Sequence, residues 1–368
     1  MMEPDEITRQ RLSSQGILRS IPKKSEDAVF SLGAVQAQDY NAALWAIGLR
    51  CKEGTTKSEI ESSIAEHKIV RNWLMRGTLH FAASEDMRWI MNLLSPRLSR
   101  TAALRDSRLR LTENVIKKTK VLLYNALRGG KHLNRKEIYE ILKKGCVPTT
   151  NNLGYHMLYR AAWDGLICFG LHDGKQPTFA LLDDWVPQGK TLSNEEAIAE
   201  LTLRYFTSHG PATIKDFVWW SGLRVSDATA GIKRVSSKIK TETINGTAYY
   251  MSKAMHTPND SQTMNLLPAF DEYLISYSDR SAMLDHPDTQ KALKSGNVFI
   301  HSNGIFLPTI VADGKVIGTW KQKRIKNKCI LKVSPFVKLK PAQIKGISEA
   351  AEGYGRFMES EVKLIGSN

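Results

Sequence analysis

Hydrophobic and polar positions along the chain follow an order that occurs three times, helices followed by a short two-stranded hairpin. In the first occurrence, the helical segments are 25–38 and 56–66, and the strand-like segments are 69–75 and 78–81. Apolar residues recur with the helical period in the former, and β-branched and aromatic residues dominate the latter. Arg76-Gly77 is the predicted turn between the two strands.

The second and third occurrences follow the same order. The second consists of helices 134–144 and 151–165 and strands 166–169 and 177–180, around the turn Asp173-Gly174. The third consists of helices 195–208, 213–220 and 226–235 and strands 239–244 and 247–251. Ser226 is the predicted N-cap of its helix, and Asn245-Gly246 is a strong two-residue hairpin signal.

The pattern changes after residue 260 to short strands separated by Asn-Gly and Asp-Gly turns. The strands are 297–301, 305–312, 315–320 and 329–333, followed by a helix over 344–358. We therefore predict an α+β fold of three tandem winged helix-turn-helix units, 1–105, 106–188 and 189–258. A C-terminal β-meander domain with a closing helix, 259–368, follows them. A helical pair before a hairpin is also common in α+β proteins that are not winged helices.

Charge adds a candidate class of partner. The 368 residues include 52 Lys and Arg against 37 Asp and Glu, a net charge of +15. A basic protein attracts polyanions or anionic membranes. Ten Lys and Arg residues, and no Asp or Glu, lie between Lys315 and Lys345.

Several protein classes are disfavoured by what the sequence lacks. It has no apolar run of about 18 residues and no secretory leader, so we expect no membrane span. Its four cysteines are far apart, which argues against zinc or disulfides and fits a cytoplasmic protein. P-loop, dinucleotide-binding, zinc-protease and nucleophile-elbow motifs are absent, so we expect no nucleotide or metal cofactor.

The run Val35-Gln36-Ala37-Gln38-Asp39 places two amides and a carboxylate at the end of a predicted helix. On a helix Gln36 and Asp39 share a face, whereas Gln36 and Gln38 do not. For both glutamines to serve one site, the backbone must leave helical geometry there. The alternative is that these polar residues only satisfy backbone carbonyls at a helix end.

This run resembles the Q-Φ-Q signature of AlkZ-type DNA glycosylases, in the AlkZ/YcaQ superfamily of interstrand-crosslink glycosylases. Further blocks resemble the family in the same order, Trp73 to His80, Leu266 to Tyr273 and Gly304 to Trp320. The YcaQ branch has Q-Φ-D instead, so Gln38 places the chain on the AlkZ side.

The resemblance implies three winged helices around double-stranded DNA and hydrolysis of the N-glycosidic bond of N7-alkylated purines. It implies Gln36 and Gln38 as catalytic residues of a monofunctional glycosylase that unhooks interstrand crosslinks. Asp39, Thr78 and His80 become candidates for lining the site. We expect a cytoplasmic, nucleoid-associated monomer.

Basic residues in three places are the candidate DNA contacts. They are Arg76 at the first hairpin turn, Arg97 and Arg100 in an arginine-rich helix, and Lys321, Lys323, Arg324 and Lys326 after a hairpin of the meander. Solvated surface charge is the alternative for each. The acids Asp271 and Glu272 are expected to organise nearby arginines or backbone, and Trp45, Trp219 and Trp220 to lie in the core.

Two other functions remain open on this evidence. A non-catalytic winged-helix regulator would bind DNA without product, and a nuclease would need clustered metal-binding carboxylates. Release of free alkylated base without metal separates the glycosylase from both.

Overall fold

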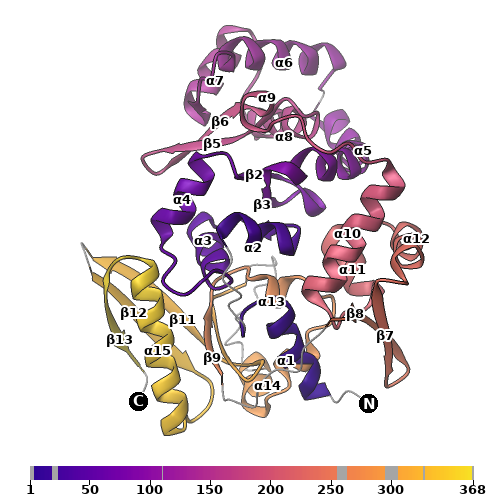
Figure 1. Ribbon diagram of the computed structural model, residues 1–368. Coiled ribbons are helices and arrows are strands. Elements are labelled where there is room, and N and C mark those ends of the chain that lie inside the picture. Colours follow the sequence, from indigo (N-terminus) through magenta and orange to yellow (C-terminus); the bar gives the residue numbers. More distant parts are fainter. Residues whose placement is uncertain are drawn as a thin grey trace. The chain divides into compact units, whose positions relative to one another are not determined.

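The computed structural model describes residues 4–18, 24–109, 111–254, 263–294, 306–325 and 328–366 (Figure 1). The chain forms two compact units. Unit 1 combines Met1–Glu61 with Ile198–Asn368, and unit 2 is the intervening Ser62–Ala197. Both ends of the chain therefore belong to the same unit.

Unit 1 contains a five-stranded sheet, a separate hairpin and helices from both parts of the chain. The helices are α1 Pro4–Ser14, α2 Ser25–Leu32, α3 Tyr40–Gly48, α4 Lys57–Ala65, α10 Asn194–His209, α11 Ile214–Ser221, α12 Val225–Val235, α13 Glu272–Ile275, η2 Ser281–Leu284, α14 Pro287–Lys294 and α15 Pro341–Phe357. The strands are β1 Val35–Gln36, β7 Ile239–Ile244, β8 Thr247–Ser252, β9 Met264–Leu267, β10 Thr309–Ala312, β11 Lys315–Ile325, β12 Lys328–Pro335 and β13 Glu361–Ile365. Helices α4 and α10 cross the boundary into unit 2.

The sheet of unit 1 has the strand order β13-β12-β11-β10-β9. β13 runs parallel to β12, whereas the other pairs are antiparallel. A parallel pair needs a crossover connection, and α15 provides it between β12 and β13. Trp45 of α3 packs against Tyr354 and Phe357 of α15 with ring centroids 5.0 and 4.9 Å away.

Unit 2 places helices beside strands β3, β2, β5, β6 and β4, which lie in that order. Its elements are β2 Ile69–Trp73, η1 Met75–Gly77, β3 Leu79–Ala83, α5 Ser84–Arg108, α6 Glu113–Leu127, β4 Leu133–Asn134, α7 Arg135–Lys144, α8 Leu153–Trp163, β5 Ile167–Asp173, β6 Gln176–Leu181 and α9 Leu182–Trp185. Trp73 is one of the large buried side chains of unit 2, and its ring contacts the rings of Phe169 and Phe179.

Turn chemistry explains two of the predicted hairpins, β7–β8 and β10–β11. Asn245 and Gly246 have φ of 48° and 75°, the positive values that a two-residue hairpin turn requires. Asp313 and Gly314 repeat this with 48° and 85°. The hairpins β2–β3, β5–β6 and β7–β8 and most of the predicted helices are confirmed within a few residues.

Several local predictions are wrong. Arg224, not Ser226, is the N-cap of α12. Trp219 is 44% exposed, although Trp45 and Trp220 lie in the core as expected. The predicted strand 297–301 lies outside the described residues, as does Lys326.

Candidate functional site

The Q-A-Q segment lies between two helices of unit 1 and is not the end of one. Helix α2 stops at Leu32 because Gly33 adopts φ 79° and donates its N–H to the Phe30 carbonyl. The chain is extended at β1, so the predicted helix over 25–38 is wrong in its last six residues. Gln36 is buried and Gln38 is exposed. The helical spacing that separated the two glutamines is therefore absent.

Asp39 has a structural role at the start of α3. Its backbone is extended, and its carboxylate accepts a hydrogen bond of 3.1 Å from the Ala42 N–H. This is N-cap geometry, which satisfies one of the unpaired donors of a helix start. The alternative considered for these polar residues, satisfaction of backbone carbonyls at a helix end, does not describe Asp39, because its carboxylate accepts from an N–H at a helix start.

A buried carboxylate supports the backbone of the Q-A-Q segment. Glu272 is fully buried, and its Oε1 accepts a 2.7 Å hydrogen bond from the Gln36 N–H. Its Oε2 accepts from Trp220 Nε1 at 3.0 Å and from Ser276 Oγ. Charge-assisted bonds to a carboxylate are stronger than neutral ones, so the position of Gln36 is strongly determined.

His209 completes the surroundings of Glu272. Its Nε2 lies 3.8 Å from Glu272 Oε2, and its ring stacks on Tyr205 at a centroid distance of 4.7 Å. Burial lowers the pKa of His209, and the nearby Glu272 carboxylate only partly opposes that shift. Around neutral pH the imidazole is therefore uncharged.

Asp271, which precedes Glu272, forms a buried ion pair with Arg50. Arg50 donates to both carboxylate oxygens of Asp271 at 2.9 Å, and also to Gln15 Oε1 at 2.7 Å. Burial alone would lower the pKa of Arg50, but the Asp271 carboxylate outweighs it and the pKa is raised. The expectation that Asp271 and Glu272 organise an arginine and backbone is confirmed.

Sequence reasoning missed that the backbone in question is that of the Q-A-Q segment. Gln36 and Glu272 are 236 residues apart, and no local pattern connects them. The available signal was an acid inside an apolar block, because a buried carboxylate needs donors from elsewhere.

Thr78 and His80 belong to the β2–β3 hairpin of unit 2, and Arg76 lies in its turn. Arg76 and Gly77 have φ of 54° and 74°, and both positions are half-buried. Thr78 Oγ1 donates to the Met75 carbonyl at 3.1 Å. His80 is buried, and its Nδ1 lies 2.9 Å from the Thr78 carbonyl oxygen. A carbonyl oxygen only accepts, so Nδ1 carries the hydrogen, and Nε2 is the nitrogen this bond does not use.

The candidate DNA contacts that the structure describes are exposed, except for the half-buried Arg76. Arg97 and Arg100 follow Pro96 in α5, and Arg100 Nε donates to the Pro96 carbonyl at 3.3 Å. Asp106, the acid among these arginines, lies against His156 and Arg160.

The described part of the basic tract of unit 1 lies in strands, because β11 continues to Ile325, past residue 320 where the predicted strand ends, and β12 begins at Lys328. Lys321 pairs with Lys332 and Arg324 with Cys329 across the two strands. Alternate residues point to opposite faces of a sheet, so Lys321 and Lys323 share one face and Arg324 lies on the other. Lys332, on the face of Lys321, is an exposed cation that sequence reasoning did not select.

The candidates are divided between the units. Unit 1 carries Gln36, Gln38, Asp39 and the β11 cations, and unit 2 carries Arg76, Thr78, His80, Arg97 and Arg100. In the part of the chain that the structure describes, no three His, Cys, Asp or Glu side chains gather as metal ligands. Among the same residues, no helix is long and apolar enough to cross a bilayer.

Comparisons with known proteins agree with one another. The model of the family described as "DNA glycosylase AlkZ-like" matches residues 29–357. A Streptomyces sahachiroi protein described as "Interstrand DNA cross-link repair glycosylase" is 23% identical over 372 residues, covering 94% of both chains. The solved structure of Streptomyces sahachiroi DNA glycosylase AlkZ superposes with a TM-score of 0.76 at 21% identity. It covers 98% of this chain and 99% of that one.

Proposed function

Because the chain belongs to the AlkZ-like DNA glycosylase family, we propose that it hydrolyses the N-glycosidic bond of N7-alkylated purines and unhooks interstrand crosslinks. The observation that carries the proposal is the Q-A-Q segment held by Glu272. The segment leaves helical geometry where two amides must serve one site, and a buried carboxylate fixes its backbone.

Amide side chains suit this chemistry because the leaving base needs no general acid. An N7-alkylated purine is cationic, and it becomes neutral when the C1′–N9 bond breaks and the electron pair stays on the base. The sugar is left with oxocarbenium-like positive charge. Water adds to C1′, and its proton passes to solvent.

We assign Gln38 to position the attacking water and Gln36 to orient Gln38 or the deoxyribose. An amide oxygen accepts a hydrogen bond and is favourable near developing positive charge, although it is too weak a base to remove a proton early. The exposure of Gln38 and the burial of Gln36 fit this division of roles. Thr78 and His80 remain proposed site-lining residues, tested by His80→Gln.

We also propose a division of the chain into three winged helices and a C-terminal domain. Three winged helices, 1–105, 106–188 and 189–258, with the C-terminal domain 259–368, would bind damaged double-stranded DNA as a cytoplasmic monomer. The order of elements supports the second winged-helix unit, 106–188. Its elements α6, β4, α7, α8 and the β5–β6 hairpin follow one another, and β4 pairs with β6.

The test is release of free base from a duplex that contains N7-methylguanine, with EDTA present. We expect release by the native protein and a loss of about 10²-fold or more in Gln38→Ala, the size of effect seen when a positioning group is removed. Gln290→Ala, an exposed glutamine of α14, is the matched control. Wild-type rates in Gln38→Ala would remove the assignment, and tight binding without base release would favour a regulator.

Crosslink unhooking needs its own substrate. A duplex joined through the N7 atoms of guanines on opposite strands should separate into single strands on a denaturing gel after incubation. Monoadduct release without unhooking would restrict the proposal to single-base damage.

A further inference from the structure

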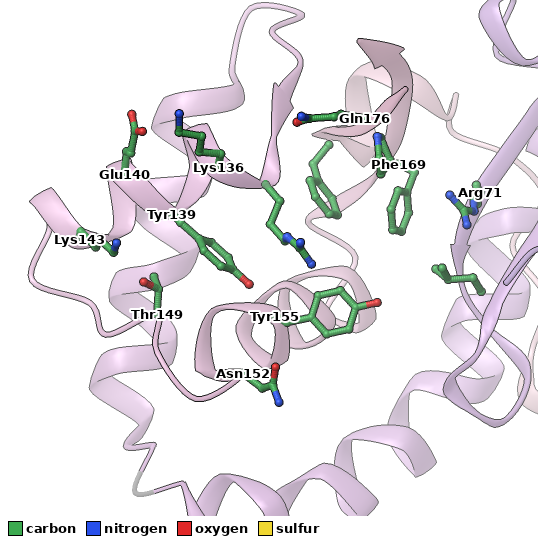
Figure 2. A pocket seen from close by; sticks show the side chains of 14 residues that line it. Arg71, Lys136, Tyr139, Glu140, Lys143, Thr149, Asn152, Tyr155, Phe169 and Gln176 are labelled. Atoms are coloured by element: carbon green, nitrogen blue, oxygen red, sulfur yellow. The ribbon is translucent and has the colours of Figure 1, made fainter. Parts of the chain in front are cut away.

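A cavity of about 1080 Å³ opens in unit 2 between α7, α8 and the β5–β6 hairpin (Figure 2). All of its lining residues belong to unit 2, and none is a candidate catalytic residue. This volume is slightly above the range of about 300–1,000 Å³ that is usual for ligand pockets. The cavity is therefore large enough for more than one nucleotide-sized group.

Positive charge dominates the lining. Arg71, Arg135, Lys136 and Lys143 face one acid, Glu140. Across the ranges that the structure describes, no ion pair involves Arg135, Lys136 or Lys143. A solvated cation that is not neutralised by the protein remains available to an anionic ligand.

Aromatic rings form the centre of the same cavity. Figure 2 shows Tyr139 and Tyr155 projecting from α7 and α8 toward its middle, with Phe169 beside Arg71. The Arg71 guanidinium lies 4.9 Å from the centroid of the Phe169 ring. Both tyrosines are half-buried, so part of each ring is exposed in the cavity.

Gly154 of α8 explains how Tyr139 reaches this position. A Cβ at residue 154 would lie 2.6 Å from the Tyr139 ring, closer than real Cβ contacts. The tyrosine ring therefore packs directly on the α8 backbone. A ring supported on one side by backbone is a rigid stacking surface for a planar group on its other side.

We propose that this cavity binds an unstacked stretch of single-stranded DNA, with bases on Tyr139 and Tyr155 and phosphates beside Arg135 and Lys143. The faces of bases in a duplex are covered by their neighbours, so aromatic side chains inside a cavity reach only bases that have left the stack. Cations near aromatic rings match the alternation of phosphate and base along a strand. Binding of undamaged DNA does not depend on base release, so this proposal and the glycosylase proposal fail independently.

Fluorescence anisotropy with a labelled oligothymidine tests the stacking contribution in the full-length protein. Tyr139→Leu should weaken binding roughly 5- to 150-fold, the range for loss of one stacked base. Tyr139→Phe should keep wild-type affinity because it keeps the ring. Unchanged binding by a Tyr139→Leu protein with the wild-type Tm would overturn the proposal, as would equal losses for both variants.

The salt dependence of the same binding tests the phosphate contacts. The double substitution R135Q/K143Q should lower the slope of log K against log salt concentration by about 1.4, or 0.7 per cation for a single strand. The control K117Q/K118Q removes the same charge from exposed positions of α6 that do not line the cavity. Equal slope changes in both double variants would contradict the assignment. Tighter binding of oligouridine RNA than of oligothymidine would contradict the choice of DNA.

Discussion

Replacing Glu272 by glutamine separates support of the Q-A-Q segment from ordinary core stability. The carboxylate accepts from the Gln36 N–H through one oxygen and from Trp220 and Ser276 through the other. Glutamine has the same shape but a single acceptor oxygen. Either the Gln36 N–H or the Trp220 N–H must then face an amide NH₂ group.

The energetic cost follows from this count. A buried donor without an acceptor costs about 1–3 kcal/mol, and the remaining bonds lose the contribution of charge. We expect Glu272→Gln to be about 2–4 kcal/mol less stable. At roughly 2–4 °C per kcal/mol, its Tm should fall by on the order of 10 °C.

Activity should fall further than stability explains. Under single-turnover conditions at a temperature where the variant is folded, we expect base release from N7-methylguanine DNA to be about 10²-fold slower. That is the effect of displacing a catalytic group by about 1 Å. Wild-type rates and Tm in Glu272→Gln would refute the reasoning.

The adjacent acid is the matched control. Asp271→Asn leaves the buried charge of Arg50 without its partner, which costs about 3–5 kcal/mol. Within the described residues, Asp271 makes no hydrogen bond to positions 33–39. The folded fraction of the Asp271→Asn variant should therefore release base at the wild-type rate. An equal loss of rate in both variants would show that core integrity, and not the Gln36 contact, is measured.

Three further predictions concern stability, pH and DNA binding. The folded-state pKa of His209 is lowered, so the unfolded state binds its proton first as pH falls. Stability should thus drop below about pH 6.5, by up to ~1.4 kcal/mol per pH unit, and His209→Phe should flatten that slope in urea titrations from pH 7 to 5. Gly33→Ala should cost about 1 kcal/mol in the same assay because φ is 79°, while the added Cβ would lie a tolerable 3.5 Å from Trp220; an unchanged midpoint would contradict this. Removing Lys321 and Lys323 together should lower the salt slope of duplex binding by about 1.8, and Arg324→Gln on the opposite face should lower it by less than 0.9.

Most helices and hairpins could be predicted because turn residues and apolar periodicity are enough to specify them. Asn245-Gly246 and Asp313-Gly314 specify tight turns, and the hairpin β7–β8 follows from the first of these. The error at 25–38 arose because apolar spacing continues past Gly33, while the positive φ of that glycine ends the helix. Apolar periodicity alone does not show where a helix ends, so the glycine has to be weighed as a helix-ending residue before the spacing.

The candidate site was predictable only in part. The glutamines were visible through their spacing and resemblance, whereas the support from Glu272 is a contact across 236 residues. The opposite faces of Lys321 and Arg324 depend on strand geometry, which was not predicted to extend through the basic tract. Asp39 was a candidate for lining the site, and its structural role was not predicted because an N-cap is recognised only when the start of its helix is known.

The division of the chain into a discontinuous and a continuous unit has a consequence for biosynthesis. Residues 62–197 form a complete unit before Glu272 leaves the ribosome, whereas Gln36 is made 236 residues before its buried acceptor. At about 5–20 residues per second, that interval is roughly 10–50 s. During that interval the nascent chain carries the Q-A-Q segment without the contact that fixes it. The proposed activity should arise only after the segment that contains Glu272 has been synthesised.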